Sequence, residues 1–201
     1  MQLICEAPLA AYLVDLDDVD YKHPLIQHKV QQLQETPRLS NLERAQAAFE
    51  FVRDEIHHSC DIQSSRVTCK ASEVLVAGEG ICEAKAHLLA ALLRAQGIPA
   101  GFCYQRVVLD EEQGGHCLHC LNAVYLAELG HWIRLDARGN KPGVQAEFGV
   151  AQEKIAYTMR PELGEIDYPT IYAQPHPAML RALHEYTDCI EMCLSGLPEA
   201  I

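Results

Sequence analysis

The sequence lacks a long hydrophobic run, an excess of basic residues and a pairing pattern among its cysteines. No stretch is apolar for long enough to span a bilayer, and the first six residues contain no basic segment of a secretory signal. Lys and Arg number 16 against 28 Asp and Glu, a net charge of -12 that argues against nucleic acid or an anionic membrane as partner. Nine cysteines without a disulfide framework predict mostly free thiols and a reducing, cytoplasmic compartment.

The chain is long enough to bury a substantial core. It has 201 residues, of which 49% are hydrophobic, and contains neither repeats nor low-complexity tracts. We expect one domain over residues 1–201, with a core at about 40–148 and a C-terminal extension at about 149–201. The sequence gives no indication of the oligomeric state.

Two helices are predicted near the N-terminus. Apolar residues recur at helical spacing from 24 to 35, and Pro37 should end that helix. Ser40 followed by Glu43 has the spacing of a capping box, so a second helix should begin there and continue to about residue 56.

A third, longer helix is expected after a glycine-rich break. Ser72 should cap a short helical turn over 74–76, which Gly78 and Gly80 then interrupt. Residues 82–96 that follow carry apolar side chains on nearly all sides, which is typical of a helix buried in the middle of a fold.

Strands dominate the next part of the chain. The pattern predicts strands over 102–109, 118–126 and 131–135, a further strand over 144–148, and a closing helix over 177–194. Helices thus precede strands, which favours an α+β fold with a central helix packed on an antiparallel sheet.

Three residues in this framework carry groups suited to nucleophilic catalysis. Cys82 begins the buried helix, where the positive end of the helix dipole favours thiolate over thiol. His119 lies in a predicted strand and Asp136 directly follows the next one. A nucleophile, a base and an orienting carboxylate therefore follow one another in chain order.

Their convergence depends on the register of one hairpin. If the loop has two or four residues, Leu126 lies opposite His131 and Leu121 faces Asp136. His119 is then a diagonal neighbour of Asp136, at roughly 7–8 Å between backbone positions. A loop of three or five residues would place the two side chains on opposite faces.

Other residues near the proposed nucleophile are candidates for supporting roles. The backbone N–H of Cys82 could stabilise an oxyanion, and His57, His58 and Gln63 are candidates for a second donor. The helix residues Glu83 and Lys85 are expected to be solvated or paired at the surface. Trp132 shares the face proposed for the three catalytic groups, where it either forms a wall of the cleft or packs in the core.

Residues 116–120 allow a zinc alternative, because they contain two histidines and two cysteines. Alternation along a strand sends neighbouring side chains to opposite faces, so one strand cannot complete a tetrahedral site. Cys60, Cys69 or Cys103 would have to supply the missing ligand. We expect no metal ion and no cofactor.

Several segments together resemble the transglutaminase-like superfamily. Residues 71–75, 80–86 and 92–100 are similar to its nucleophile segment, and 119–126 and 132–136 are similar to its histidine and aspartate strands. The resemblance covers about residues 45 to 140. The combination of segments is more specific than any one of them.

This resemblance implies a papain-like α+β fold and a catalytic triad of Cys82, His119 and Asp136. Superfamily members include protein-crosslinking transglutaminases, cysteine peptidases and peptide N-glycanases, so the fold alone does not specify the substrate. Where the family often has Trp and Glu after the histidine, this chain has Leu121 and Ala123.

The sequence thus leads to a principal hypothesis and three alternatives. We expect a cysteine-dependent acyl-transfer enzyme acting on amide bonds of peptides or proteins, most simply by hydrolysis because water is always available. The alternatives are a protein-glutamine crosslinking transglutaminase, a catalytically silent binding module on the same fold, and a zinc-stabilised scaffold.

Overall fold

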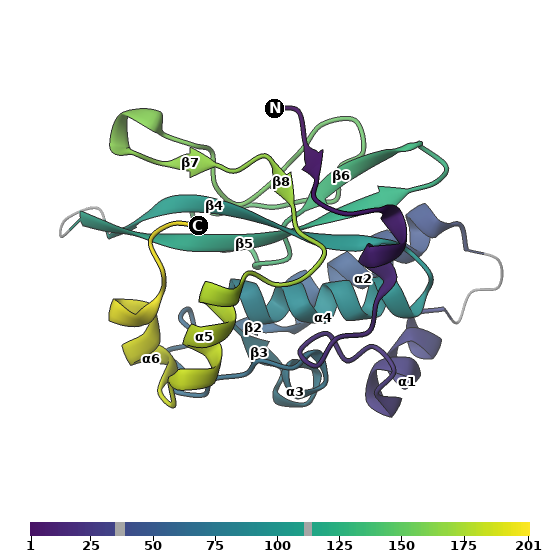
Figure 1. Cartoon of the computed structure of the whole chain (residues 1–201). Coiled ribbons are helices and arrows are strands. Elements are labelled where there is room, and N and C mark those ends of the chain that lie inside the picture. Colours follow the sequence, from purple (N-terminus) through teal and green to yellow (C-terminus); the bar gives the residue numbers. More distant parts are fainter. Residues whose placement is uncertain (35–38, 111–113) are drawn as a thin grey trace.

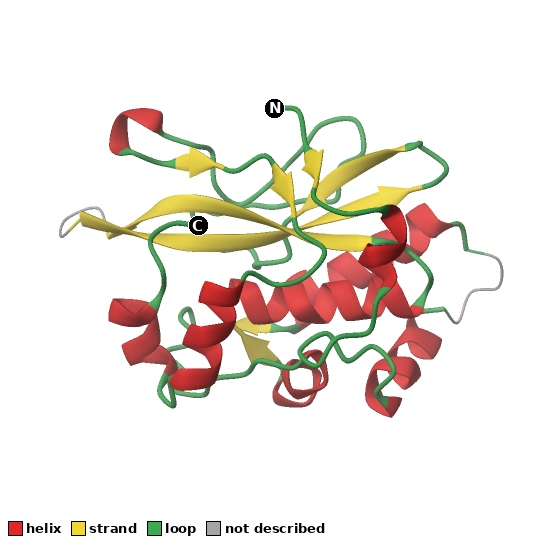
Figure 2. Cartoon of the chain, in the orientation of Figure 1, coloured by secondary structure: helices red, strands yellow, loops and turns green. Residues whose placement is uncertain are grey.

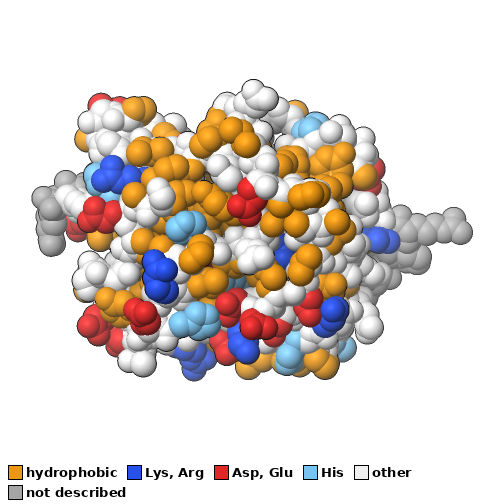
Figure 3. Space-filling model, in the orientation of Figure 1, with side chains coloured by type: hydrophobic (Ala, Val, Ile, Leu, Met, Phe, Trp, Pro, Cys, Tyr) orange, Lys and Arg blue, Asp and Glu red, His pale blue; other side chains and the backbone are white. Residues whose placement is uncertain are grey.

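The computed structural model describes residues 1–34, 39–110 and 114–201. Its two main layers are an antiparallel sheet and a layer of helices packed on one face of that sheet (Figures 1 and 2). Most of the helical layer precedes the sheet in the chain, and this order confirms the predicted α+β class. On the face in Figure 3, hydrophobic side chains spread across the middle, while charged and histidine side chains gather along the lower edge.

The main sheet has the strand order β6-β5-β4-β7. Its strands are β4 (Ala100–Asp110), β5 (Gly114–Leu126), β6 (His131–Leu135) and β7 (Ile166–Asp167). Residues 127–130 join β5 to β6, and Leu126 pairs with His131 as the sequence predicted. Because side chains alternate along a strand, this register decides which residues share the face of His119.

Helix α4 (Cys82–Ala95) lies against the sheet and is buried on all sides, as predicted. Its alanines allow the backbones of helix and sheet to approach closely, and the Asn122 amide of β5 donates to the Ala86 carbonyl at 3.1 Å. Gly97, with a φ of 74°, follows the end of the helix in a conformation that favours glycine. The chain then turns directly into β4.

Three helices that precede α4 in the chain pack against it. They are α1 (Pro24–Leu33), α2 (Asn41–Glu55) and α3 (Ala71–Ala77). The predicted capping box of α2 is present, because the Ser40 N–H donates to Glu43 at 2.8 Å and the Glu43 N–H donates to the Ser40 hydroxyl at 3.2 Å. Pro37, expected to end α1, lies outside the described residues.

Three sequence predictions in less regular segments were wrong. Ser72 lies inside α3, where its hydroxyl donates to Asp20 at 2.5 Å, and Lys70 is the N-cap. Residues 144–148 form no strand, since only Val144 makes an isolated bridge. The closing helix is interrupted at residues 186–188 because Asp188 caps a new start, accepting from the Ile190 N–H at 2.8 Å. Its parts are α5 (Pro177–Glu185), α6 (Cys189–Glu191) and the π-helical turn η3 (Met192–Gly196).

Short elements attach the two ends of the chain to the sheet. The remaining strands are β1 (Ile4–Cys5), β2 (His57–His58), β3 (Glu79–Gly80) and β8 (Thr170–Ile171), and the 3₁₀ turns are η1 (Leu9–Leu13) and η2 (Pro161–Leu163). β1 pairs in parallel with β8, and the Tyr12 hydroxyl of η1 donates to the Ile171 carbonyl at 2.8 Å. Tyr12 and Ile171 belong to a small second apolar cluster beyond the sheet, separate from the main core around α4.

Candidate active site

Cys82 is the first residue of α4, and two short strands fix the segment before it. β2 and β3 pair in parallel, which places His58 beside Gly80. A side chain at Gly80 would meet the Ala84 Cβ at 3.0 Å, so glycine lets this segment pass close to the helix. The N–H groups of the first helical turn have no partner within the helix, and this turn begins at Cys82, which is only 9% exposed.

His119 and Asp136 form a buried pair across the sheet. His119 Nε2 lies 2.8 Å from Asp136 Oδ2, and the two residues are 3% and 0% exposed. The Asp136 carboxylate also accepts from the backbone N–H of Ala156 at 2.9 Å and from that of Arg138 at 3.1 Å. Three donors thus hold the carboxylate, and it in turn holds the imidazole ring.

The environment of this pair favours its charged form. Burial acts to lower the pKa of His119, but the Asp136 carboxylate and the Cys82 thiol outweigh it and hold that pKa well above 6.5. Burial likewise acts to raise the pKa of Asp136, but His119 and the two backbone N–H groups lower it. An imidazolium and a carboxylate in contact explain both directions.

Cys82 and His119 line the same cavity, whose volume is about 340 Å³. The Cys82 side chain contributes to the raised pKa of His119, both by hydrogen bonding and by electrostatic interaction. Since Asp136 occupies Nε2 of His119, Nδ1 is the ring nitrogen left for the thiol. The structure therefore brings together the three residues that the sequence singled out.

Other residues that line the cavity did not follow from the sequence. The Tyr157 ring packs edge-on against His119, with centroids 4.8 Å apart, and restricts the rotation of the imidazole. Arg138 forms two hydrogen bonds with Asp61, at 2.5 and 2.7 Å, across the cavity wall. Tyr157 and Arg138 lie in irregular segments, where no periodicity marks them.

His58 also lines this cavity, and its Nδ1 is buried without a hydrogen-bond partner among the described residues. Burial, then the positive charge of Arg138, lowers the pKa of His58 to about 3. Its ring is therefore neutral at pH 7 and carries one N–H. Of the three donors suggested by the sequence, His58 is the one that lines the cavity with Cys82.

Glu83 and Lys85 are both fully buried, so the expectation of surface positions was wrong. Glu83 accepts a hydrogen bond from the Tyr104 hydroxyl at 2.9 Å, and its carboxylate also lies 3.2 Å from His87 Nε2. The Lys85 ammonium donates to the backbone carbonyl of Ile56. Partners from distant segments thus compensate both charged groups.

The positions where this chain departs from the family pattern serve packing. Leu121 and Ala123 belong to the second apolar cluster beside Tyr12. Trp132 packs against Tyr12 and Tyr125, at centroid distances of 4.8 and 5.6 Å, and lies outside the cavity that contains Cys82.

The zinc alternative on β5 finds no support in the geometry of residues 116–120. His116 Nε2 lies 2.9 Å from the Leu163 carbonyl, and His119 is paired with Asp136. Cys120 lies on the face of β5 opposite to His119, toward Glu83. The ligands therefore diverge, as alternation along a strand requires.

Most cysteines are free thiols, as expected, but one pair forms a disulfide. Seven of them are free, but Cys60 forms a disulfide with Cys193, 133 positions away. Both residues line the cavity that contains Cys82, so the bond joins two walls of the candidate site. Since disulfides are rare in cytosolic proteins, it weakens the compositional argument for a reducing compartment.

Comparisons with known proteins identify the family of this chain and a similar fold. The family model of the transglutaminase-like superfamily matches residues 27–137, which is more than half of the chain. The chain belongs to the transglutaminase-like superfamily. A search of curated proteins gave no match.

A solved structure from Cytophaga hutchinsonii, described as that of a proposed cysteine protease, is similar to this chain with a TM-score of 0.53 and 18% sequence identity. The match covers 65% of this chain and 42% of that protein, so the chain spans less than half of its length. At this identity the likeness shows the fold.

Membership in the superfamily supports an enzyme that depends on a cysteine. Within the described ranges, no helix combines the length and hydrophobicity needed to cross a membrane.

Proposed function

We propose that this protein is a cysteine-dependent acyl-transfer enzyme that hydrolyses amide bonds of peptides or proteins. Cys82 would be the nucleophile, His119 the general base and acid, and Asp136 the group that orients the imidazole. The observation that carries the proposal is the position of His119, held by Asp136 on one side and facing Cys82 on the other, at a cavity open to a substrate.

In the first half of the reaction, the Cys82 sulfur attacks the carbonyl carbon of the amide. The positive charge that Asp136 supports on His119 favours the thiolate, because opposite charges attract at short range. His119 donates its proton to the departing amine as the C–N bond breaks. The product of this step is a thioester between Cys82 and the acyl group.

In the second half, His119 accepts a proton from water as the water oxygen attacks the thioester carbonyl. The C–S bond breaks, the carboxylic acid leaves and the thiolate is restored. The backbone N–H of Cys82 and the neutral His58 ring are our candidates for the donors that stabilise the oxyanion in both halves. Removal of one such donor typically lowers the rate about 10²–10³-fold.

The cavity also suggests a class of substrate side chain. Val107 and Leu109 from β4 and Leu194 and Leu197 from the C-terminal segment contribute an apolar wall. We therefore expect a preference for an apolar residue next to the cleaved bond. The same chemistry would give crosslinking if an amine replaced water, and a catalytically silent binding module on this fold is the second alternative.

Alkylation with iodoacetamide, followed residue by residue by mass spectrometry, tests the proposal without a known substrate. Cys5 is exposed whereas Cys82 is 9% exposed, so accessibility alone predicts that Cys5 reacts faster. We expect the opposite order, and we expect His119→Ala to remove the advantage of Cys82. His131→Ala is a matched control, because His131 is exposed and, among the described residues, its ring bonds only to the Leu129 carbonyl.

Slow labelling of Cys82 in both the wild type and the His119→Ala variant would contradict the enzyme and favour the binding module. For the reaction itself, peptides with an apolar residue before the cleaved bond would be incubated with and without an added primary amine. Release of a free carboxylate in the presence of the amine supports hydrolysis. Incorporation of the amine supports crosslinking.

A further inference from the structure

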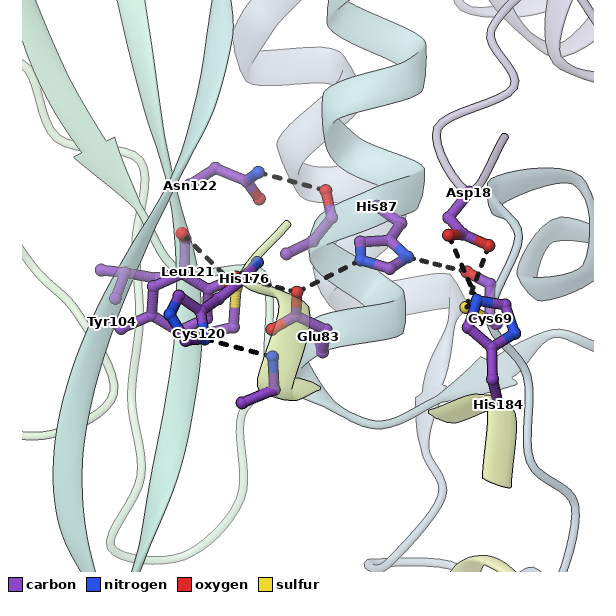
Figure 4. Close-up of polar contacts among 12 residues, drawn as sticks. Asp18, Cys69, Glu83, His87, Tyr104, Cys120, Leu121, Asn122, His176 and His184 are labelled. Carbon is purple, nitrogen blue, oxygen red and sulfur yellow. Dashed lines mark hydrogen bonds and ion pairs between the residues drawn. The ribbon is translucent and has the colours of Figure 1, made fainter. Parts of the chain in front are cut away.

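A second group of metal-binding side chains lies apart from the candidate active site. Asp18, Cys69 and His184 come from the loop before α1, the loop before α3 and the last turn of α5, and they meet at one point (Figure 4). Cys69 Sγ lies 3.3 Å from Asp18 Oδ1 and 3.7 Å from His184 Nε2. His184 Nε2 lies 3.3 Å from Asp18 Oδ2.

The sulfur–nitrogen separation matches that between two ligands of a tetrahedral zinc ion, and the Asp18 carboxylate places Oδ1 beside the sulfur and Oδ2 beside the nitrogen. With bonds of about 2.3 Å to sulfur and 2.0–2.1 Å to nitrogen and oxygen, tetrahedral angles give about 3.6 Å between sulfur and nitrogen. The same geometry gives about 3.3 Å between nitrogen and oxygen and about 3.5 Å between sulfur and oxygen. A thiolate, an imidazole and a carboxylate are also the three ligand types that zinc takes in proteins.

We propose that Asp18, Cys69 and His184 bind one Zn²⁺ ion. Binding would replace the thiol proton of Cys69 by a sulfur–zinc bond and release that proton to solvent. The thiolate and the carboxylate together carry two negative charges, which neutralise the two positive charges of the ion. The site departs from the expectation, based on the sequence, that the chain holds no metal.

The fourth coordination position would face a cavity of about 440 Å³ that Cys69 and His184 line together with Glu73 and the cationic residues Arg66 and Lys70. Three protein ligands and one side open to solvent leave room for a water molecule. His184 is the exposed member of the group, with 53% of its side chain accessible, so the ion could enter from this side.

The site is connected by hydrogen bonds to the helix that carries Cys82. The Cys69 carbonyl lies 2.8 Å from His87 Nδ1, and His87 Nε2 lies 3.2 Å from the Glu83 carboxylate (Figure 4). Glu83 follows Cys82 directly in α4. A zinc ion would therefore fix α5 to the N-terminal loop and hold the segment on which the first turn of α4 rests.

The experiment is a titration of the full chain with Zn²⁺ and, separately, with Co²⁺. A Cys189→Ser background removes one thiol of the other group of potential ligands, formed by Cys60, Cys189 and Cys193. We expect one equivalent of Zn²⁺ in calorimetry. We expect Co²⁺ to give the visible bands of a tetrahedral ion and a near-ultraviolet sulfur-to-cobalt charge-transfer band.

Single substitutions in this background locate the ion. His184→Ala should weaken binding at least about 100-fold, since even the loss of a residue that only supports a ligand costs about 10–100-fold. Cys69→Ser should remove the charge-transfer band. His28→Ala is the matched control, because His28 is an exposed helical histidine outside the group, and it should bind zinc like the parent protein.

His184 lies at the surface, so its substitution should leave the chain folded, which circular dichroism without metal verifies. Absence of binding to the parent protein would overturn the proposal and leave the three residues as a hydrogen-bonded group. Unchanged affinity in both His184→Ala and Cys69→Ser would also overturn it, because the ion would then lie elsewhere. Equal weakening by His28→Ala would indicate non-specific binding and refute the site.

Discussion

Replacement of Asp136 by Asn changes the pair that orients the proposed general base. The amide keeps the size of the side chain but loses the charge. Its NH₂ group must face either His119 Nε2 and the Ala156 N–H, or the Arg138 N–H. Loss of one partner from a buried pair costs about 3–5 kcal/mol. Because Asp136 is fully buried and His119 is 3% exposed, solvent does little to reduce this cost.

The cost should depend on pH in a defined way. The pKa of His119 is raised above 6.5 in the folded state. The stability that the charged imidazole contributes is therefore complete below pH 6.5, and it is lost as the pH rises through the pKa of the folded state. The pKa of Asp136 is lowered from 3.8, so its contribution is present above pH 3.8 and is lost as the pH falls through the folded value. The free energy of unfolding of the wild type should therefore exceed that of the variant by the largest amount between pH 3.8 and pH 6.5.

Urea unfolding of both proteins at a series of pH values measures this difference in the free energy of unfolding. Asp17→Asn makes the same chemical change at an exposed position and should alter stability by less than about 0.5 kcal/mol. A difference between wild type and Asp136→Asn that stays constant from acid to alkaline pH would refute the charged pair. A difference below about 1 kcal/mol at its maximum would also refute the reasoning about burial.

Three further substitutions test other parts of the fold. Tyr104→Phe removes a hydroxyl that donates to Glu83 at 2.9 Å and accepts from the His176 N–H at 2.7 Å; we expect chemical denaturation to show a loss of about 1–3 kcal/mol. Lys85→Met removes an ammonium whose pKa is lowered, mainly by burial, from 10.5 to about 7. Between these values the unfolded chain binds more protons, so wild-type stability should rise relative to the variant from pH 7 to 10.5 in a urea series. Gly101→Ala would place a methyl group 2.7 Å from a backbone carbonyl of the crossing segment, and thermal unfolding should show a loss of about 1–3 kcal/mol.

Each of these expectations has a contrary outcome. Tyr125→Phe removes a hydroxyl that bonds to no other described residue, so a loss as large as that of Tyr104→Phe would contradict the role of the two hydrogen bonds. A difference between wild type and Lys85→Met that does not change with pH would exclude the lowered pKa. A Gly101→Ala variant as stable as the wild type would show that the crossing segment can move.

The parts of the site that could be predicted lie in helices and strands, where side chains recur at a regular spacing along the sequence. The continuous apolar surface of α4 indicated a central helix, and strand alternation with an even loop placed His119 on the face of Asp136. Both inferences used only neighbours along the chain or across one hairpin. The relative position of the proposed base and its carboxylate could therefore be predicted from the local sequence pattern.

The parts that could not be predicted depend on contacts between distant segments. Charged residues in the first turn of a helix usually face solvent, and only the fold reveals that Tyr104 and the Ile56 carbonyl compensate Glu83 and Lys85. The Tyr157 ring reaches His119 from an irregular segment. Such pairings leave no periodic signal in the sequence.

The parallel pairing of β1 with β8 has a consequence for the order of synthesis. Tyr12 leaves the ribosome before its partner Ile171, which is 159 positions further along the chain. At about 5–20 residues per second, the N-terminal segment waits on the order of ten to thirty seconds before its docking surface is made. During translation that segment is available to chaperones and nascent-chain proteases until β8 has been made.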